Sequence, residues 1–230
     1  MTMNQTLLDL IKTHPMMNRE RSLEDQEVIA FFKGLDLESI LSEGKMVLEV
    51  GCGKGNTLRQ MAHKYGIIPY GVDLDDYSGT FNPTNDPILF SIGDAEDLRY
   101  PDNKFDFVFA FMCHRYVGDK LKSLKDIHRV MKVGALAVID LTGTNNTNWV
   151  DTGIDPDIET ILSYFPNGGQ LKLDKIPIHQ GKDSEPLTCY RIIIHKSLTK
   201  ALEFPSLSKE PYYDISSNVT KSVYDRDFIW

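Results

Sequence analysis

The sequence predicts an α/β protein built on a doubly wound, mostly parallel sheet of seven strands with an antiparallel edge strand. Strand-like and helix-like stretches alternate between about residues 45 and 141, which is typical of parallel strands joined by helices. The runs FVFAF (107–111) and ALAVI (135–139) are entirely apolar, and such runs suit strands that are covered on both faces. Two further strand-like stretches follow near the C-terminal end, and these predict the antiparallel edge.

Each element is expected where the hydrophobic pattern and the turn residues agree. The strands are expected at 45–50, 67–73, 87–94, 104–112, 133–141, 170–178 and 187–195. The helices are expected at 22–41, 56–66, 120–132 and 155–165. In the second helix the buried stripe consists of Leu58, Met61, Ala62 and Tyr65. Gly66 provides its stop signal.

Length and composition indicate one globular unit with appendages. The chain has 230 residues, of which 41% are hydrophobic and 25% charged, as in an ordinary single domain. We expect a core over 45–199. A helical segment at 1–44 is expected to act as a substrate lid or cap. Its helix at 22–41 would begin with Ser22 and Asp25 as an imperfect capping box. The residues 200–230 form a tail.

Charge and cysteine content narrow the class of protein. The net charge of -8 argues against a nucleic-acid partner, because such affinity depends on cationic residues that release counterions. The lysine-rich stretch 120–132 is interpreted as a solvated helix face. No apolar run approaches the roughly 20 residues of a membrane span. Cys52, Cys113 and Cys189 show no zinc spacing, and we interpret them as reduced thiols of a cytoplasmic protein.

The stretch VLEVGCGKGN, residues 47–56, places three glycines just after the first strand, where α/β sheets bind ligands. It is not a phosphate loop, because Lys54 is not followed by Ser or Thr. It is not a dinucleotide fingerprint, because position 56 is Asn. Glu49 would repel a pyrophosphate and would favour a cation or an amino group. The loop therefore predicts a cationic ligand without phosphate.

Four motifs follow one another over about residues 45–141: EVGCGKG, GVDLD, GDAEDLRYPDNKFDFVFA and LKDIHRVMKVGALAVID. Their order and spacing resemble the class I S-adenosylmethionine-dependent methyltransferases, in particular the small-molecule branch similar to the ubiquinone and menaquinone biosynthesis type. The resemblance implies a Rossmann-like fold, S-adenosylmethionine as donor and S-adenosylhomocysteine as product. It also implies a small organic acceptor, methylated at an O, N or C nucleophile by in-line displacement. No metal ion is expected, and nothing predicts an oligomeric state.

The donor-binding residues implied by the resemblance all lie near the carboxyl ends of strands. They are Glu49, Gly51, Cys52, Gly53, Asp73, Leu74, Asp94, Ala95, Phe111 and Met112. Glycines without a Cβ atom let the backbone approach the donor. Asp73 would accept the ribose hydroxyls, with Asp75 as the alternative.

Two of these acids also have a structural interpretation. Asp94 would take the adenine amino group, with the Ala95 backbone against the ring, or it would cap a turn. Glu49 is either a ligand or a solvated strand end. Phe111 and Met112 would flank the donor.

Catalytic candidates follow the fourth strand in the stretch CHRY: His114, Arg115 and Tyr116. Methyl transfer depends mostly on holding the nucleophile in line, and a base is needed only for a nucleophile that keeps its proton. His114 is therefore either a base that titrates near neutrality or a residue that shapes the loop. Arg115 would orient a carboxylate on the acceptor. A protein or RNA acceptor, and a non-catalytic donor-binding regulatory subunit, stay as alternatives.

Overall fold

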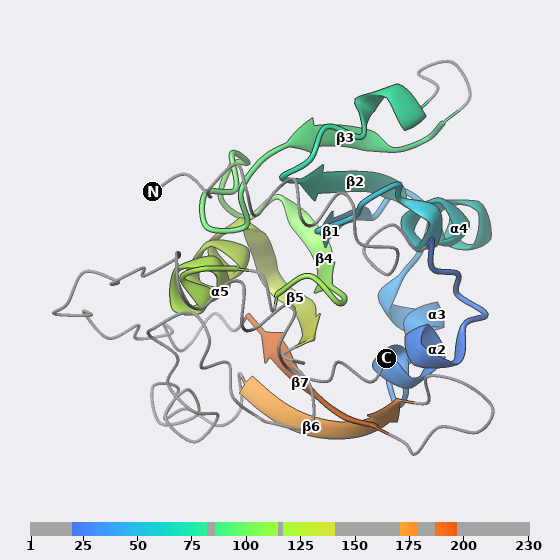
Figure 1. Ribbon diagram of the computed structural model, residues 1–230, viewed down its shortest axis with the longest axis vertical. Helices are drawn as coiled ribbons and strands as arrows, with labels where there is room; N and C mark the ends of the chain where they lie inside the picture. The colour runs from blue at the N-terminus through green and yellow to red at the C-terminus, as the bar shows by residue number, and fades with distance from the viewer. Residues whose placement is uncertain (1–19, 82–85, 115–116, 141–170, 179–186, 197–230) are drawn as a thin grey trace, which may run out of the picture.

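A seven-stranded sheet forms the centre of the molecule in the computed structural model, which describes residues 20–81, 86–114, 117–140, 171–178 and 187–196 (Figure 1). The strands are β1 (Met46–Val50), β2 (Ile68–Asp73), β3 (Leu89–Ile92), β4 (Phe105–Ala110), β5 (Met131–Asp140), β6 (Leu171–Ile178) and β7 (Leu187–His195). Their order is β3-β2-β1-β4-β5-β7-β6. Strands β1 to β5 pair in parallel, whereas β7 is antiparallel to β5 and to the edge strand β6. The predicted fold class is confirmed.

Helices cover both faces of this sheet (Figure 1). On one side lie α2 (Gln26–Phe32), α3 (Leu37–Ile40) and α4 (Asn56–Tyr65), and α5 (Lys120–Val130) lies on the other. The short 3-10 helix η1 (Ser78–Thr80) precedes β3. A separate buried cluster fills each interface, one around Phe107 and Phe109 and the other around Leu124 and Ile127. The sheet is thus wound on both faces, as the apolar runs of β4 and β5 predict.

The helix expected over 22–41 is wrong in extent, because the chain forms two short helices there. Gly34 lies between α2 and α3 with a φ of 79°, a left-handed conformation that ends helices. Asp25 is the N-cap of α2, and its carboxylate accepts the Ser22 amide at 2.9 Å. Phe31 and Phe32, the last residues of α2, are both buried in the cluster around Phe107 and Phe109. The helix expected at 155–165 and the tail 200–230 lie outside the described residues.

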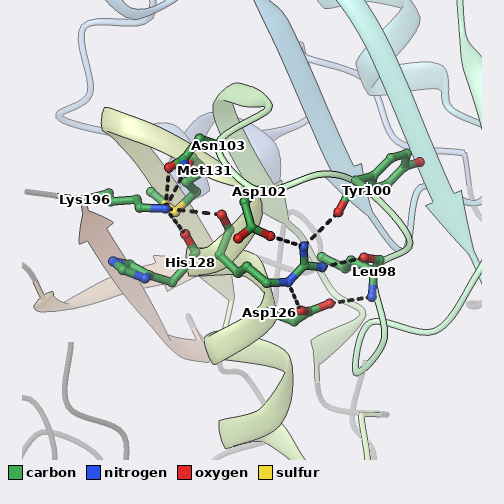
Figure 2. Close-up of polar contacts among 9 residues, drawn as sticks. Leu98, Tyr100, Asp102, Asn103, Asp126, His128, Met131 and Lys196 are labelled. Carbon is green, nitrogen blue, oxygen red and sulfur yellow. Dashed lines mark hydrogen bonds and ion pairs between the residues drawn. The ribbon is translucent and has the colours of Figure 1, made fainter. Parts of the chain in front are cut away.

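Lys196 binds the C-terminal end of α5, close to the amino ends of β4 and β5 (Figure 2). Its Nζ atom donates to the carbonyl oxygens of His128, Arg129 and Met131 at 2.9, 3.2 and 2.9 Å, and to Asn103 Oδ1 at 2.8 Å. The last carbonyls of a helix have no partner within it, and a cation there is favourable. Lys196 thereby joins the end of β7 to α5.

Arg129 joins the same helix end to the loop before β4. Its guanidinium donates to Asp126 at 2.6 Å, to Asp102 at 2.8 Å, and to the carbonyl oxygens of Leu98 and Tyr100 at 2.6 and 2.8 Å (Figure 2). These residues belong to the two longest motifs of the sequence. Their spacing therefore reflects a structural junction as well as the position of a ligand site.

We expect Lys196→Met to lower the free energy of unfolding by about 1–3 kcal/mol, because several carbonyls lose a charged donor. Chemical denaturation measures this, and Lys125→Met, at an exposed position of the same helix, is the control. Burial and then the charge of Lys196 lower the pKa of His128 to about 4. The pKa of His128, followed by NMR, should rise in Lys196→Met. Equal stability of both variants would contradict the proposed junction.

Candidate cofactor-binding site

The glycine loop connects β1 to α4 at the carboxyl end of the sheet. The amides of Gly51 and Cys52 donate to the Val72 carbonyl at 2.8 and 3.2 Å, which joins the loop to β2. Cys52 is buried, and burial raises the pKa of its thiol well above the usual value. Its Sγ atom would lie 2.7 Å from a Cβ atom at Gly71. The thiol is therefore a protonated group packed against β2.

The three glycines of the loop serve different purposes, although Gly51, Gly53 and Gly55 all have positive φ, at 72°, 51° and 71°. A Cβ atom at Gly51 would lie 2.2 Å from Cys113 Cβ, and one at Gly55 would lie 2.5 Å from Ile88 Cδ1. A Cβ atom at Gly53 would meet no atom of the described residues within 4 Å. Packing therefore requires glycine at position 51, whereas at position 55 the nearest atom is the end of a flexible side chain and the positive φ is the stronger reason for glycine. Gly53 borders open space that a ligand can use.

Asp73 ends β2 and is tied directly to the glycine loop. Its Oδ2 atom accepts the Gly53 amide at 2.8 Å, and its Oδ1 atom accepts the Asp75 amide at 3.2 Å. Burial raises the pKa of Asp73 above its ordinary value. Asp75 is more deeply buried than Asp73, and Leu74 between them is exposed. Asp73 therefore contacts the glycine loop directly.

Glu49 is buried beside the loop and is not a solvated strand end. Only 6% of the residue is exposed, and its Oε2 atom has no hydrogen-bond partner among the described residues. Burial, and then the charge of Asp73, raise the pKa of Glu49 well above its ordinary value, while Arg21 acts in the opposite direction. A buried acceptor without a donor is unfavourable. The position suits a ligand that brings a cationic donor.

Arg21 is a residue of this site that no sequence motif indicates. Its guanidinium carbon lies 5.5 Å from the centre of the Phe111 ring, within the range of a cation–π contact. Its carbonyl oxygen accepts hydrogen bonds from the side chains of Asn56 and Thr57, at 2.8 and 3.2 Å, where α4 begins. Arg21 therefore brings a positive charge from the N-terminal segment to the end of β4, close enough to influence Glu49.

Phe111 and Met112 follow β4 and lie next to the N-terminal segment. The ring of Phe111 is 4.6 Å from that of Phe31, centre to centre. Met112 has a φ of 58°, and its amide donates to Asp140 Oδ2 at 3.0 Å. Residues far apart in the sequence thus meet at this turn.

The residues assigned to the adenine form a tight turn after β3. Asp94 Oδ1 accepts the Glu96 amide at 2.9 Å, and the Asp94 carbonyl accepts the Asp97 amide at 3.0 Å. Ala95 is buried. The turn-capping interpretation of Asp94 is therefore correct, and its contact with adenine stays a prediction.

His114 is enclosed in the protein, with none of its surface exposed and its Nε2 atom 3.2 Å from Ser123 Oγ. Burial, and then the charge of Lys120, lower the pKa of His114 to about 3. This neutral, enclosed imidazole fits the loop-shaping role better than that of a base. Lys120 is itself buried, with Nζ donating to the Val117 carbonyl at 3.2 Å, so it is not part of a solvated face. Arg115 and Tyr116 lie outside the described residues.

The described ranges also bear on metal binding and on membrane insertion. In those ranges, no group of three or more His, Cys, Asp and Glu side chains is arranged to hold a metal ion. None of the helices described is both long and apolar enough to cross a membrane.

The described residues form a doubly wound sheet with a glycine loop and a buried acid, Glu49, at the carboxyl ends of its strands. Residues 48–139 match the family model described as a methyltransferase domain. Together with the motifs, this match identifies that stretch as a class I S-adenosylmethionine-dependent methyltransferase domain. S-adenosylmethionine is the cofactor of such a domain.

Several curated methyltransferases are similar to this chain in sequence. Norajmaline N-methyltransferase from Rauvolfia serpentina is 30% identical over 125 residues, which is 51% of this chain and 43% of that protein. The 2-methyl-6-phytyl-1,4-hydroquinone methyltransferase of Synechocystis is 31% identical over 115 residues, 48% of this chain and 35% of that protein. The match to each relative spans less than half of its length.

A solved structure of phosphoethanolamine N-methyltransferase 2 from Haemonchus contortus contains phosphomonomethylethanolamine and S-adenosylhomocysteine. It superimposes with a TM-score of 0.57 at 16% identity, over 75% of this chain and 52% of that chain. This likeness shows the common fold.

Proposed function

We propose that the protein transfers a methyl group from S-adenosylmethionine to an O, N or C nucleophile of a small organic acceptor. The observation that carries this proposal is Glu49 Oε2, a buried carboxylate oxygen without a donor among the described residues, beside a loop whose Gly53 borders open space. The amino group of the donor's methionine portion would supply the missing hydrogen bond. The residues present therefore fit this cofactor.

Each charged or polar residue of the site has a suitable counterpart on the donor. Glu49 would hold the ammonium group and Arg21 the carboxylate, so the zwitterion meets one charge of each sign. Asp73 would accept the ribose hydroxyls with the lone pairs that the Gly53 and Asp75 amides leave free. The bound donor supplies an activated methyl group on a sulfonium. The protein then contributes the position and orientation of the two reactants.

A small acceptor is supported by the relatives, whose names specify an alkaloid, a hydroquinone and phosphoethanolamine. The segment that carries Arg21 and Phe31 would form one wall of the acceptor site, because both contact Phe111. With His114 enclosed, positioning would provide most of the acceleration. Arg115 and Tyr116 stay candidates for contact with the acceptor.

Calorimetry with S-adenosylhomocysteine and with NAD tests the donor. We expect S-adenosylhomocysteine to bind with a 1:1 stoichiometry and NAD to give no heat, because Glu49 repels a pyrophosphate. Binding of NAD without binding of S-adenosylhomocysteine would refute the proposal. Incubation with methyl-labelled donor and a panel of phenols, amines and hydroquinones should then transfer label to one chemical class. Donor binding with no transfer to small molecules, but with transfer to protein or RNA, would refute the proposed acceptor.

A further inference from the structure

The turn after β4 contains a strained residue, Met112. With a φ of 58° it is one of two non-glycine residues in the described part of the chain with a positive φ, the other being Asn103. This conformation is unfavourable for a side chain with a Cβ atom and persists only where the surroundings impose it. The Met112 amide donates to Oδ2 of Asp140, the last residue of β5, at 3.0 Å, and Asp140 is only 1% exposed. A buried carboxylate thus holds the strained turn.

Arg191 of β7 lies directly opposite Asp140 in the antiparallel pairing with β5, and only 3% of it is exposed. Residues paired in this way have Cβ atoms about 5 Å apart and interact favourably when their charges are opposite. The guanidinium of Arg191 also donates to the carbonyl oxygens of Phe31 and of Lys33, the latter at 2.6 Å. Lys33 is the C-cap of α2. Arg191 therefore joins the end of α2 to the strand position that faces Asp140.

Helix α2 reaches the same turn by a second contact. The ring of Phe31 packs on Phe111, which precedes Met112, and the Arg21 guanidinium lies over the same Phe111 ring. Met112 is thus held by the carboxyl end of β5, and Phe111 by the N-terminal segment.

We propose that Asp140 and Arg191 are positioning residues of the donor site. Asp140 holds Met112 in its left-handed conformation, and Arg191 couples that turn to α2, so that Phe111 and Met112 are placed to contact the donor. This inference rests on the proposed function, because Phe111 and Met112 are assigned to the donor site. It adds two residues, Asp140 at the end of the fourth motif and Arg191 on β7, whose effect on donor binding is exerted through the turn.

The test removes the need for the Asp140 hydrogen bond by placing glycine at position 112, since glycine adopts positive φ freely. S-adenosylhomocysteine affinity is measured by calorimetry for Asp140→Ala alone, with Met112→Ala and with Met112→Gly. We expect Asp140→Ala to weaken binding about tenfold in the wild-type and Met112→Ala backgrounds, and less than about twofold in the Met112→Gly background. Asp140→Asn retains an acceptor and should lose less affinity than Asp140→Ala.

Asp106 provides a matched control at the opposite end of the sheet. Its carboxylate also accepts a main-chain amide, that of Met46 at 2.9 Å, and pairs with Lys132 and Lys45 at 2.8 and 3.8 Å. Asp106→Ala removes the same kind of bond, together with these ion pairs, and should still leave the affinity unchanged. If Asp140→Ala is too unstable, the pair Asp140→Ala with Arg191→Met removes both charges and takes its place in all three backgrounds.

The outcomes separate this inference from the proposed function. Wild-type protein that binds no S-adenosylhomocysteine overturns both. Wild-type binding with the same loss for Asp140→Ala in all three backgrounds overturns the positioning role alone, because a general loss of structure would not depend on residue 112. Hydrogen exchange provides a second readout for Arg191. Exchange in α2 should become faster in Arg191→Met, and unchanged exchange there would overturn the coupling to the N-terminal segment.

Discussion

Gly53→Val is expected to abolish donor binding, with the affinity for S-adenosylhomocysteine falling by more than about a hundredfold, or about 2.7 kcal/mol. Two effects act together. The φ of 51° at this position is strained for any residue with a Cβ atom and most strained for a β-branched one. The isopropyl group would also occupy the open space that the donor needs. Titration calorimetry with the purified variant measures the loss.

Gly44→Val separates these two effects. Gly44 has a φ of 79°, and a Cβ atom there would likewise meet nothing within 4 Å in the part of the chain that the structure describes, but Gly44 precedes β1 at the amino end of the sheet. The control variant has comparable backbone strain and should bind S-adenosylhomocysteine like wild type. Wild-type affinity in Gly53→Val would mean that the donor does not approach this loop.

Glu49→Gln is expected to weaken S-adenosylhomocysteine binding by about thirtyfold to a hundredfold, because the ligand's ammonium group loses a buried carboxylate partner. The ligand-free protein should at the same time become more stable at neutral pH. Burial raises the pKa of Glu49, so the unfolded chain ionises this group at a lower pH than the folded protein does. The ionised form therefore disfavours folding above the unfolded pKa, and the penalty grows until the pH exceeds the folded pKa.

The pH dependence gives this prediction a characteristic signature. The stability gain of Glu49→Gln should vanish near pH 4 and increase toward neutral pH, as followed by thermal unfolding without ligand. Glu38→Gln is the control, since Glu38 is exposed on α3, and it should change neither property. A variant that loses stability at pH 7 while keeping its affinity would show that Glu49 has a structural partner instead.

The sequence predicts the sheet and the position of the ligand because both depend on local patterns. Apolar runs identify β4 and β5, and the spacing of Gly51, Gly53 and Gly55 identifies the turn between β1 and α4. The extent of the first helix is the main error, because Gly34 interrupts a stretch whose apolar spacing looks continuous. The C-terminal strands are predicted with nearly correct ends, since turn residues bound both of them.

The residues that complete the site are less visible in the sequence because they meet only through folding. Arg21 precedes Glu49 by 28 positions, and Arg191 follows its strand partner Asp140 by 51. No local spacing connects them. Asn56 is the one available clue. It breaks the dinucleotide fingerprint, and in the structure its side chain binds the carbonyl of Arg21. His114 shows the reverse case, a residue type associated with chemistry that is enclosed by the fold.

The junction that Lys196 and Arg129 form has a consequence for how such a protein changes during evolution. It lies at the amino ends of the strands, whereas the ligand site and its unfavourably buried Glu49 lie at the carboxyl ends. Substitutions that alter ligand preference at the carboxyl ends leave the contacts of Lys196 and Arg129 at the amino ends intact. Residues of the ligand site can therefore change during evolution while the junction at the amino ends continues to stabilise the fold.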